Sequence, residues 1–108
     1  MSGGAKLDQL NESAWLRIGE HSESLEDLDK AFVAYENVLR YNESNVQALR
    51  QIIGICRTLG RHPQAIVYFL RLLRIEPTNG EIWASLGHSY VLFLSSIFAS
   101  RFSFLIFI

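Results

Sequence analysis

This sequence of 108 residues contains few cysteines and prolines, and its charges nearly balance. It holds one cysteine and two prolines, and its net charge at pH 7 is −1. A lone Cys56 excludes an internal disulfide and fits a reducing compartment. The near-neutral charge argues against a general nucleic-acid binder, because such proteins gather a strong basic excess on one face. The start of the chain has no apolar run, so we expect no secretory signal and synthesis in the cytosol.

The patterns of catalytic, phosphate-binding and metal sites are also missing. The three histidines are scattered, with no second histidine or carboxylate at ligand spacing. An acidic run from Glu23 to Asp29 lacks the glycine-containing ligand loop that calcium requires, which favours a solvated turn. We find no glycine-rich phosphate loop, nucleophile elbow or Ser/His/Asp arrangement. The sequence therefore predicts no enzyme, no catalytic residues, no cofactor and no metal.

Apolar residues are unevenly distributed along the chain. Residues 91–108 hold 13 apolar residues, four serines, five of the seven phenylalanines and a single charge, Arg101. The preceding residues have the composition of an ordinary soluble domain. We therefore interpret residues 91–108 as an apolar tail that needs an explanation of its own.

A period of 34 residues runs through the chain before residue 91. Large apolar, small and aromatic side chains each recur at this spacing. The shift superposes Trp15 on Leu49 and Trp83, Ile18 on Ile52 and Leu86, Ala31 on Ala65, Tyr35 on Phe69, and Asn45 on Asn79. A constant period with matching chemistry indicates stacked structural repeats. We place two repeats at residues 12–45 and 46–79 and a partial repeat at 80–90, after a flexible N-terminus of residues 1–11.

Each repeat contains two amphipathic helices. Apolar residues at helical spacing, separated by polar gaps, predict helices near 12–24, 28–41, 45–58, 62–75 and from 79 onward. Capping and terminating residues support these bounds: Asn11, Ser44 or Asn45, and Thr78 or Asn79 as N-caps, Gly60 as a stop, and Pro63 in a first turn. No strand pattern competes before residue 91. The predicted fold class is all-α, an antiparallel helix-pair solenoid of about two and a half repeats.

The spacing assigns the large aromatic side chains to the core rather than to a binding site. The predicted core aromatics are Trp15, Tyr35, Phe69, Trp83 and Tyr90. Cys56 lies on the same apolar stripe, so we interpret it as a small buried hydrophobe rather than a nucleophile.

The residues of each repeat resemble the tetratricopeptide repeat family. Trp83-x-x-Leu86-Gly87-x-x-Tyr90 matches the opening of its pattern, and Trp15-x-x-Ile18-Gly19-x-x-Ser22 nearly does. Ala31-x-x-x-Tyr35 and Ala65-x-x-x-Phe69 match its second helix, while Glu43 replaces the expected proline of the first repeat. Where the two helices cross closely, we expect a large side chain on the first helix to fill the space left by small Gly and Ala residues.

Residues 14–90 further resemble the first repeats of the fungal general transcriptional co-repressors that partner a WD-repeat co-repressor. Three segments carry this resemblance: AWLRIGEHSESLEDLDKAFVAYENVLRYN, VQALRQIIGICR and IWASLGHSY. It implies a nuclear protein-interaction scaffold for transcriptional repression, whose repeats dock the helical N-terminal region of the WD-repeat partner. It also implies that this chain is only the opening of a longer array.

First helices of such repeats line a concave face, which is the predicted partner-binding groove. Helical spacing selects ten groove residues: Leu16, Glu20, Glu23, Gln47, Arg50, Gly54, Arg57, Glu81, Ala84 and His88. Arg50 and Arg57 lie two turns apart with Gly54 between them, which leaves space for an acidic helix to approach both guanidinium groups. The alternative is that these arginines form a merely solvated face. Leu16 and Glu20 stand where chaperone-type repeats carry a carboxylate clamp, which counts against that class.

Three explanations compete for the apolar tail. A membrane-spanning helix of 18 residues reaches about 27 Å, slightly short of the hydrocarbon core, and would bury Arg101. It would make the chain a tail-anchored adaptor whose repeats face the cytosol. A capping helix needs a polar outer face, which this segment lacks. The third explanation, which we favour, is translated non-coding sequence, because Phe, Ser, Leu and Ile share uridine-rich codons and the break falls in mid-repeat.

Overall fold

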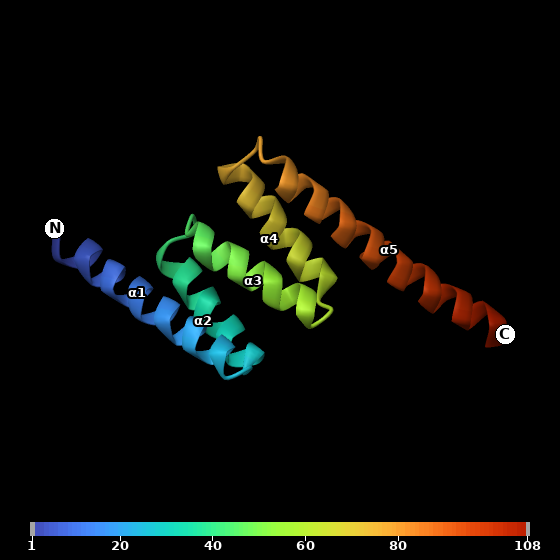
Figure 1. The fold of residues 1–108 in the computed structure, drawn as a ribbon, viewed down its shortest axis with the longest axis horizontal. Helices are drawn as coiled ribbons and strands as arrows, with labels where there is room; N and C mark the ends of the chain where they lie inside the picture. Colours follow the sequence, from blue (N-terminus) through green and yellow to red (C-terminus); the bar gives the residue numbers. More distant parts are fainter. Residues whose placement is uncertain (1, 108) are drawn as a thin grey trace. The chain divides into compact units, whose positions relative to one another are not determined.

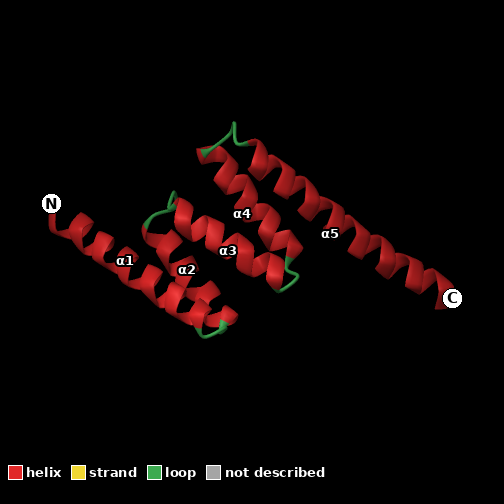
Figure 2. Cartoon of the chain, in the orientation of Figure 1, coloured by secondary structure: helices red, strands yellow, loops and turns green. Residues whose placement is uncertain are grey.

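A computed structural model describes the backbone of residues 2–107 and the side chains of residues 7–101. The described backbone forms five helices and no strand (Figures 1 and 2). The helices are α1 (Ser2–Ser24), α2 (Leu28–Tyr41), α3 (Val46–Thr58), α4 (His62–Ile75) and α5 (Gly80–Phe107). The predicted all-α, helix-pair fold is confirmed.

The chain forms two compact units, and the boundary between them falls inside α3, after Ile55. In the first unit α1 packs along α2, and in the second α4 packs along α5. The two helices of each pair are consecutive in the chain, and a short turn connects them, as Figure 1 shows. The α1–α2 pair is the helix pair of the first predicted repeat, whereas the α4–α5 pair joins the second helix of the second predicted repeat to the first helix of the partial one.

The start of α1 differs from the prediction. The helix begins at Ser2, so Asn11 lies inside it and does not cap it. Residues 5–10 read AKLDQL, and alanine, lysine, leucine and glutamine are strong helix formers, so the helix extends beyond the repeat. The flexibility expected for residues 1–11 stays a prediction, but residues 2–11 of that segment are helical.

Asparagine side chains cap the first helix of the later repeats. The Asn45 Oδ1 accepts a hydrogen bond from the Ala48 N–H at 3.0 Å, and the Asn79 Oδ1 accepts one from the Glu81 N–H at 3.1 Å. Each bond satisfies a backbone donor that the first helical turn leaves without a partner. The choice left open in the sequence between neighbouring residues thus falls on Asn45 and Asn79.

A close helix crossing in the first unit joins Gly19 of α1 to Tyr35 of α2. A Cβ atom placed on Gly19 would lie 2.6 Å from the Tyr35 Cε1, which is closer than atoms pack. Tyr35 is completely buried, and Ala31, one turn before it on α2, is buried too. A small residue does meet a large one at this crossing, but the large side chain lies on the second helix and not, as expected, on the first.

The aromatic core prediction is correct for the second helices and wrong for α5. Tyr35 and Phe69 are buried, and Trp15 is half-buried. Trp83 and Tyr90, however, are 51% and 41% exposed. On α1, the equivalent stripe is covered by α2, whereas no further helix follows α5 among the described residues to cover Trp83 and Tyr90. Cys56 is buried, as predicted.

The turn between the two helices of a repeat needs a left-handed residue. Glu26 has φ 59° and Gly60, at the same repeat position, has φ 73°. Glycine adopts this conformation without a steric cost, but glutamate does not. The next equivalent position, Leu94, lies inside α5, so the helix runs straight through the place where a third turn was due.

Replacing Glu26 by glycine is expected to stabilise the first unit by up to about 1 kcal/mol, since the left-handed backbone is already present and only the side chain strains it. Urea unfolding followed by circular dichroism measures the change. The reciprocal variant Gly60→Ala should lose a similar amount. A Glu26→Gly protein that is less stable than the original would contradict the assigned strain.

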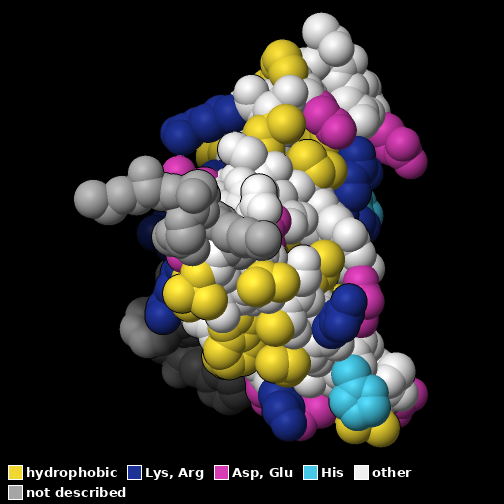
Figure 3. Space-filling model, turned by 90° about the vertical axis from the view of Figure 1, so that its left-hand side faces the viewer, with side chains coloured by type: hydrophobic (Ala, Val, Ile, Leu, Met, Phe, Trp, Pro, Cys, Tyr) yellow, Lys and Arg dark blue, Asp and Glu magenta, His cyan; other side chains and the backbone are white. Residues whose placement is uncertain are grey.

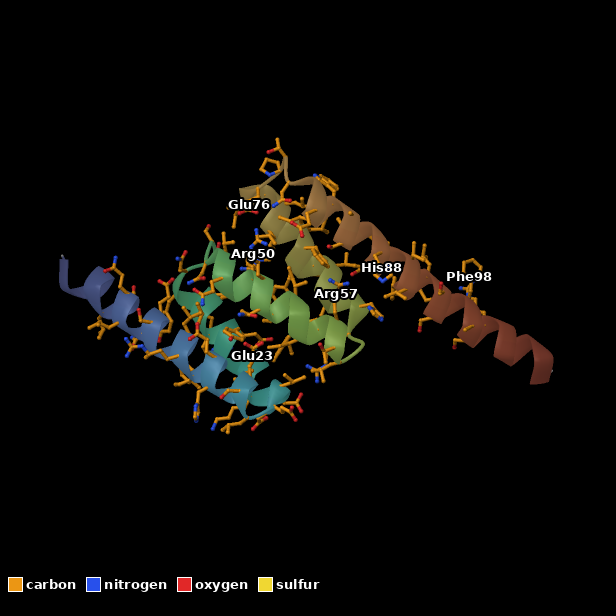
Figure 4. All side chains as sticks on the ribbon, viewed as in Figure 1. Glu23, Arg50, Arg57, Glu76, His88 and Phe98 are labelled. Carbon is orange, nitrogen blue, oxygen red and sulfur yellow. The ribbon has the colours of Figure 1, made fainter. Side chains whose placement is uncertain are left out.

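The helix α5 is long and apolar enough, by length and composition alone, to cross a membrane between Gly80 and Arg101. Little of this stretch is buried inside the protein. Phe98 projects away from the helix (Figure 4) and is 69% exposed. Among the described residues of the segment 91–108, every apolar side chain except the half-buried Phe93 is therefore exposed.

Candidate functional site

The first unit holds six of the ten predicted groove residues. Leu16, Glu20 and Glu23 come from α1, while Gln47, Arg50 and Gly54 come from α3. Glu20, Gln47, Arg50 and Gly54 are exposed, and the other two are half-buried. The helical stripes chosen from the sequence therefore reach the surface of this unit.

A hydrogen bond joins the two helices of this surface. The Gln47 Nε2 donates to the Glu20 Oε1 at 2.7 Å, so a side chain of α3 reaches one of α1 here. Both side chains are exposed. The structure thus brings Glu20 and Gln47 together, and a partner that bound either one would meet both.

Glu23 holds the core tyrosine rather than facing a groove. The Tyr35 hydroxyl donates a hydrogen bond to the Glu23 Oε2 at 2.6 Å. Burial raises the pKa of the Tyr35 phenol above its ordinary value, and the hydrogen bond and negative charge of Glu23 raise it further. The charge of Glu20 acts in the same direction. Glu23 therefore fixes the α1–α2 crossing, a role that its place on the predicted stripe did not reveal.

Arg50 and Gly54 lie on the exposed side of α3. They lie one helical turn apart, and both are exposed. A Cβ atom on Gly54 would meet nothing within 4 Å, so there is free space above the helix beside Arg50. This space, which the sequence predicted, admits the close approach of another chain.

The second unit holds the other four predicted residues, all of them exposed. Arg57 lies in the last turn of α3, and Glu81, Ala84 and His88 follow one stripe of α5. Figure 4 shows Arg57 and His88 on these two helices and Arg50 and Glu23 on α3 and α1. The predicted residues of this unit carry charges of both signs: Arg57 on α3 is basic, and Glu81 on α5 is acidic.

A polar cluster around Glu12 is structurally important and was not predicted. The Glu12 Oε1 accepts hydrogen bonds from the Asn42 Nδ2 at 3.0 Å and the Asn45 Nδ2 at 2.6 Å. These bonds fasten α1 to the turn between α2 and α3. Glu12 has no counterpart in the repeat, where Val46 and Gly80 stand, so the period carried no signal for it.

In the part of the chain that the structure describes, no group of three or more His, Cys, Asp or Glu side chains could hold a metal ion. The face that Figure 3 shows carries acidic and basic side chains interspersed with apolar ones. A surface of mixed sign with apolar patches suits contact with protein rather than with a phosphate backbone.

Comparison with known proteins gives relatives but no family match. No model of a known protein family matches the chain. It is 42% identical over 87 residues to general transcriptional corepressor trfA of Dictyostelium discoideum, and 43% identical over 86 residues to general transcriptional corepressor ssn6 of Schizosaccharomyces pombe. A more distant relative, at 26% identity over 84 residues, is general transcription factor 3C polypeptide 3 of Homo sapiens.

The aligned segment is most of this chain and a small part of each relative. It covers 81% and 80% of the chain but only 6% and 8% of the two corepressors, and 77% of the chain against 10% of the human factor. The similarity therefore concerns one short segment of much longer proteins.

Proposed function

We propose that this chain is a protein-interaction segment of a transcriptional co-repressor, built from tetratricopeptide-type repeats. The observation that carries the proposal is the similarity of about four-fifths of the chain to two general transcriptional corepressors at 42–43% identity. The helix pairs, the 34-residue period and the Gly19–Tyr35 crossing agree with the repeat pattern. A nuclear location follows from this role and is part of the proposal.

The proposed contact surface centres on the exposed first-helix residues Arg50, Gly54 and Arg57. Free space at Gly54 allows a partner helix to approach α3 closely. Two guanidinium groups on the same helix favour a partner with carboxylates, since arginine pairs with them in bidentate geometry. The proposed partner is the helical N-terminal region of a WD-repeat co-repressor. Glu23 is left out of this surface because its carboxylate is hydrogen-bonded to Tyr35.

A pull-down with the helical region of a WD-repeat co-repressor tests the surface. The variant Arg50→Glu/Arg57→Glu is expected to bind at least tenfold more weakly, because it places like charges against the partner's carboxylates. That loss corresponds to about 1.4 kcal/mol or more. Each binding constant is measured by titrating the partner.

The matched control is Arg40→Glu/Arg74→Glu, which makes the same charge change on α2 and α4 at exposed, repeat-equivalent positions. It should bind as the original chain does. Equal binding by the Arg50/Arg57 variant would remove the groove assignment, and no binding by the original chain would remove the assigned partner.

A second candidate is a tail-anchored adaptor at a membrane. The observation in its favour is the length and apolar composition of α5 between Gly80 and Arg101. Two of the three named relatives are transcriptional corepressors, which does not favour it. Membrane retention of a tagged chain after carbonate extraction would support the anchor and overturn the nuclear proposal.

A further inference from the structure

The helix α5 carries two parallel stripes at heptad spacing, and only one of them is covered. The covered stripe, Ile82, Leu86 and Ser89, is buried where α5 packs on α4. The other stripe consists of Trp83, Gly87, Tyr90, Leu94 and Ile97, which we call the α5 seam. All five residues are exposed, Leu94 at 50% and Ile97 at 37%. Apolar residues that alternate by four and three positions are the pattern by which one helix packs along another.

The first unit shows what occupies this stripe when a helix is present. Two periods earlier, Trp15, Gly19 and Ser22 stand at the positions of the first three seam residues. There α2 lies on the stripe and places the Tyr35 ring against Gly19. At Gly87 the same space is open, with nothing within 4 Å of an added Cβ. The seam is therefore a helix-binding face that lacks an aromatic side chain over its glycine.

Tyr90 on the α5 helix of a second copy could be that aromatic side chain. We propose that the chain forms a symmetric dimer in which the α5 seams of two copies pack antiparallel. With the twofold axis midway between His88 and Ser89, Tyr90 of each copy lies over Gly87 of the other. Trp83 then faces Leu94 of the second copy. A twofold interface is self-complementary, so one rotation satisfies both tyrosine–glycine contacts at once.

Charge selects the antiparallel direction. Arg101 follows Ile97 by four residues and so lies at the end of the seam. The antiparallel dimer brings it to the start of α5 in the second copy, where Glu76 and Glu81 are acidic. A parallel dimer would instead place the two Arg101 side chains together. Opposite charges at this end favour the proposed pairing, and like charges oppose the alternative.

Sedimentation of the full chain tests the dimer, with Gly87→Leu as the disrupting variant. The added side chain has free space within one copy and improves helix propensity, so α5 stays folded. It would keep the two α5 helices apart, and we expect the dimer dissociation constant to rise at least tenfold. The control Ala99→Leu adds the same side chain at an exposed position on the opposite side of α5 and should leave it unchanged.

Cysteine cross-linking tests the direction of packing. A mixture of Trp83→Cys and Leu94→Cys chains should form the mixed disulfide on oxidation, while the buried Cys56 stays unreacted. Disulfides formed instead within the Trp83→Cys chains alone would indicate a parallel pair and overturn the arrangement.

Three further results would overturn the dimer: a monomer at all accessible concentrations, equal weakening by Gly87→Leu and Ala99→Leu, or association only after phosphatidylcholine vesicles are added. The last result would assign the seam to a lipid surface. Undefined aggregates with no discrete dimer would also contradict the proposal, since the seam specifies one partner in one register.

Discussion

Replacing Gly19 by alanine should lower the free energy of unfolding by up to about 2 kcal/mol, although alanine is the better helix former. The new methyl group would lie 2.6–2.9 Å from three ring atoms of Tyr35. The ring has no room to withdraw, because it is completely buried and its hydroxyl is held by Glu23. Overpacking costs roughly 1–3 kcal/mol, and the gain of about 1 kcal/mol in helix propensity offsets part of it.

The matched control is Gly54→Ala on α3, in the same unit. Its methyl group meets nothing within 4 Å, so only the propensity term remains and stability should rise by about 0.5–1 kcal/mol. Chemical unfolding followed by helix circular dichroism measures both variants. If the two substitutions changed stability in the same direction by the same amount, the close crossing of α1 and α2 would be refuted.

The fold could be predicted from the sequence because residues that pack in the same way recur at a constant spacing. Ala31 and Tyr35 mark one helix crossing, and the 34-residue shift finds Ala65 and Phe69 in the next repeat, although Ile53 stands there in place of Gly19. Asn45 and Asn79 recur as caps for the same reason. The start of α1 at Ser2 could not be predicted this way, since residues 2–11 precede the repeat and follow only local helix propensity.

Burial was predicted wrongly where it depends on a neighbour that the pattern assumes. Trp83 has the spacing of a core residue, yet it is exposed because α5 continues as a single helix instead of turning back. Its indole N–H donates to the Pro77 carbonyl oxygen at 2.8 Å, a local contact rather than core packing. The position of a residue on a helical stripe predicts the side of the helix on which its side chain lies. Whether that side chain is buried depends on whether another element packs against that side.

The predicted groove was a set of exposed stripe positions, and the structure divides that set by what the side chains do. Glu20 and Gln47 bond to each other, and Glu23 bonds to the core. These pairings join residues 27 and 12 positions apart, so neither is visible as a local spacing in the sequence. The open space at Gly54, by contrast, was expected from the sequence and agrees with the structure.

Stability should fall as the pH rises above about 10, because Tyr35 must stay protonated in the folded chain. Burial and the Glu23 carboxylate raise the pKa of Tyr35 in the fold above the ordinary value of the unfolded chain. Below pH 10 both states carry the proton, so the full stability is present. Above it the unfolded state loses its proton first, and unfolding becomes more favourable by about 1.4 kcal/mol per pH unit until the folded pKa is reached.

The variant Tyr35→Phe isolates this effect. It removes the ionisable hydroxyl while keeping the ring over Gly19, and it should cost about 1 kcal/mol at neutral pH through the lost hydrogen bond to Glu23. Urea unfolding at pH 8 and at pH 11 gives the comparison. The original chain should lose about 1.4 kcal/mol more than the variant between these values, since only the variant lacks the buried phenol. Equal losses in the two proteins would show that other groups cause the alkaline transition, and that Tyr35 ionises in the fold as readily as in the unfolded chain.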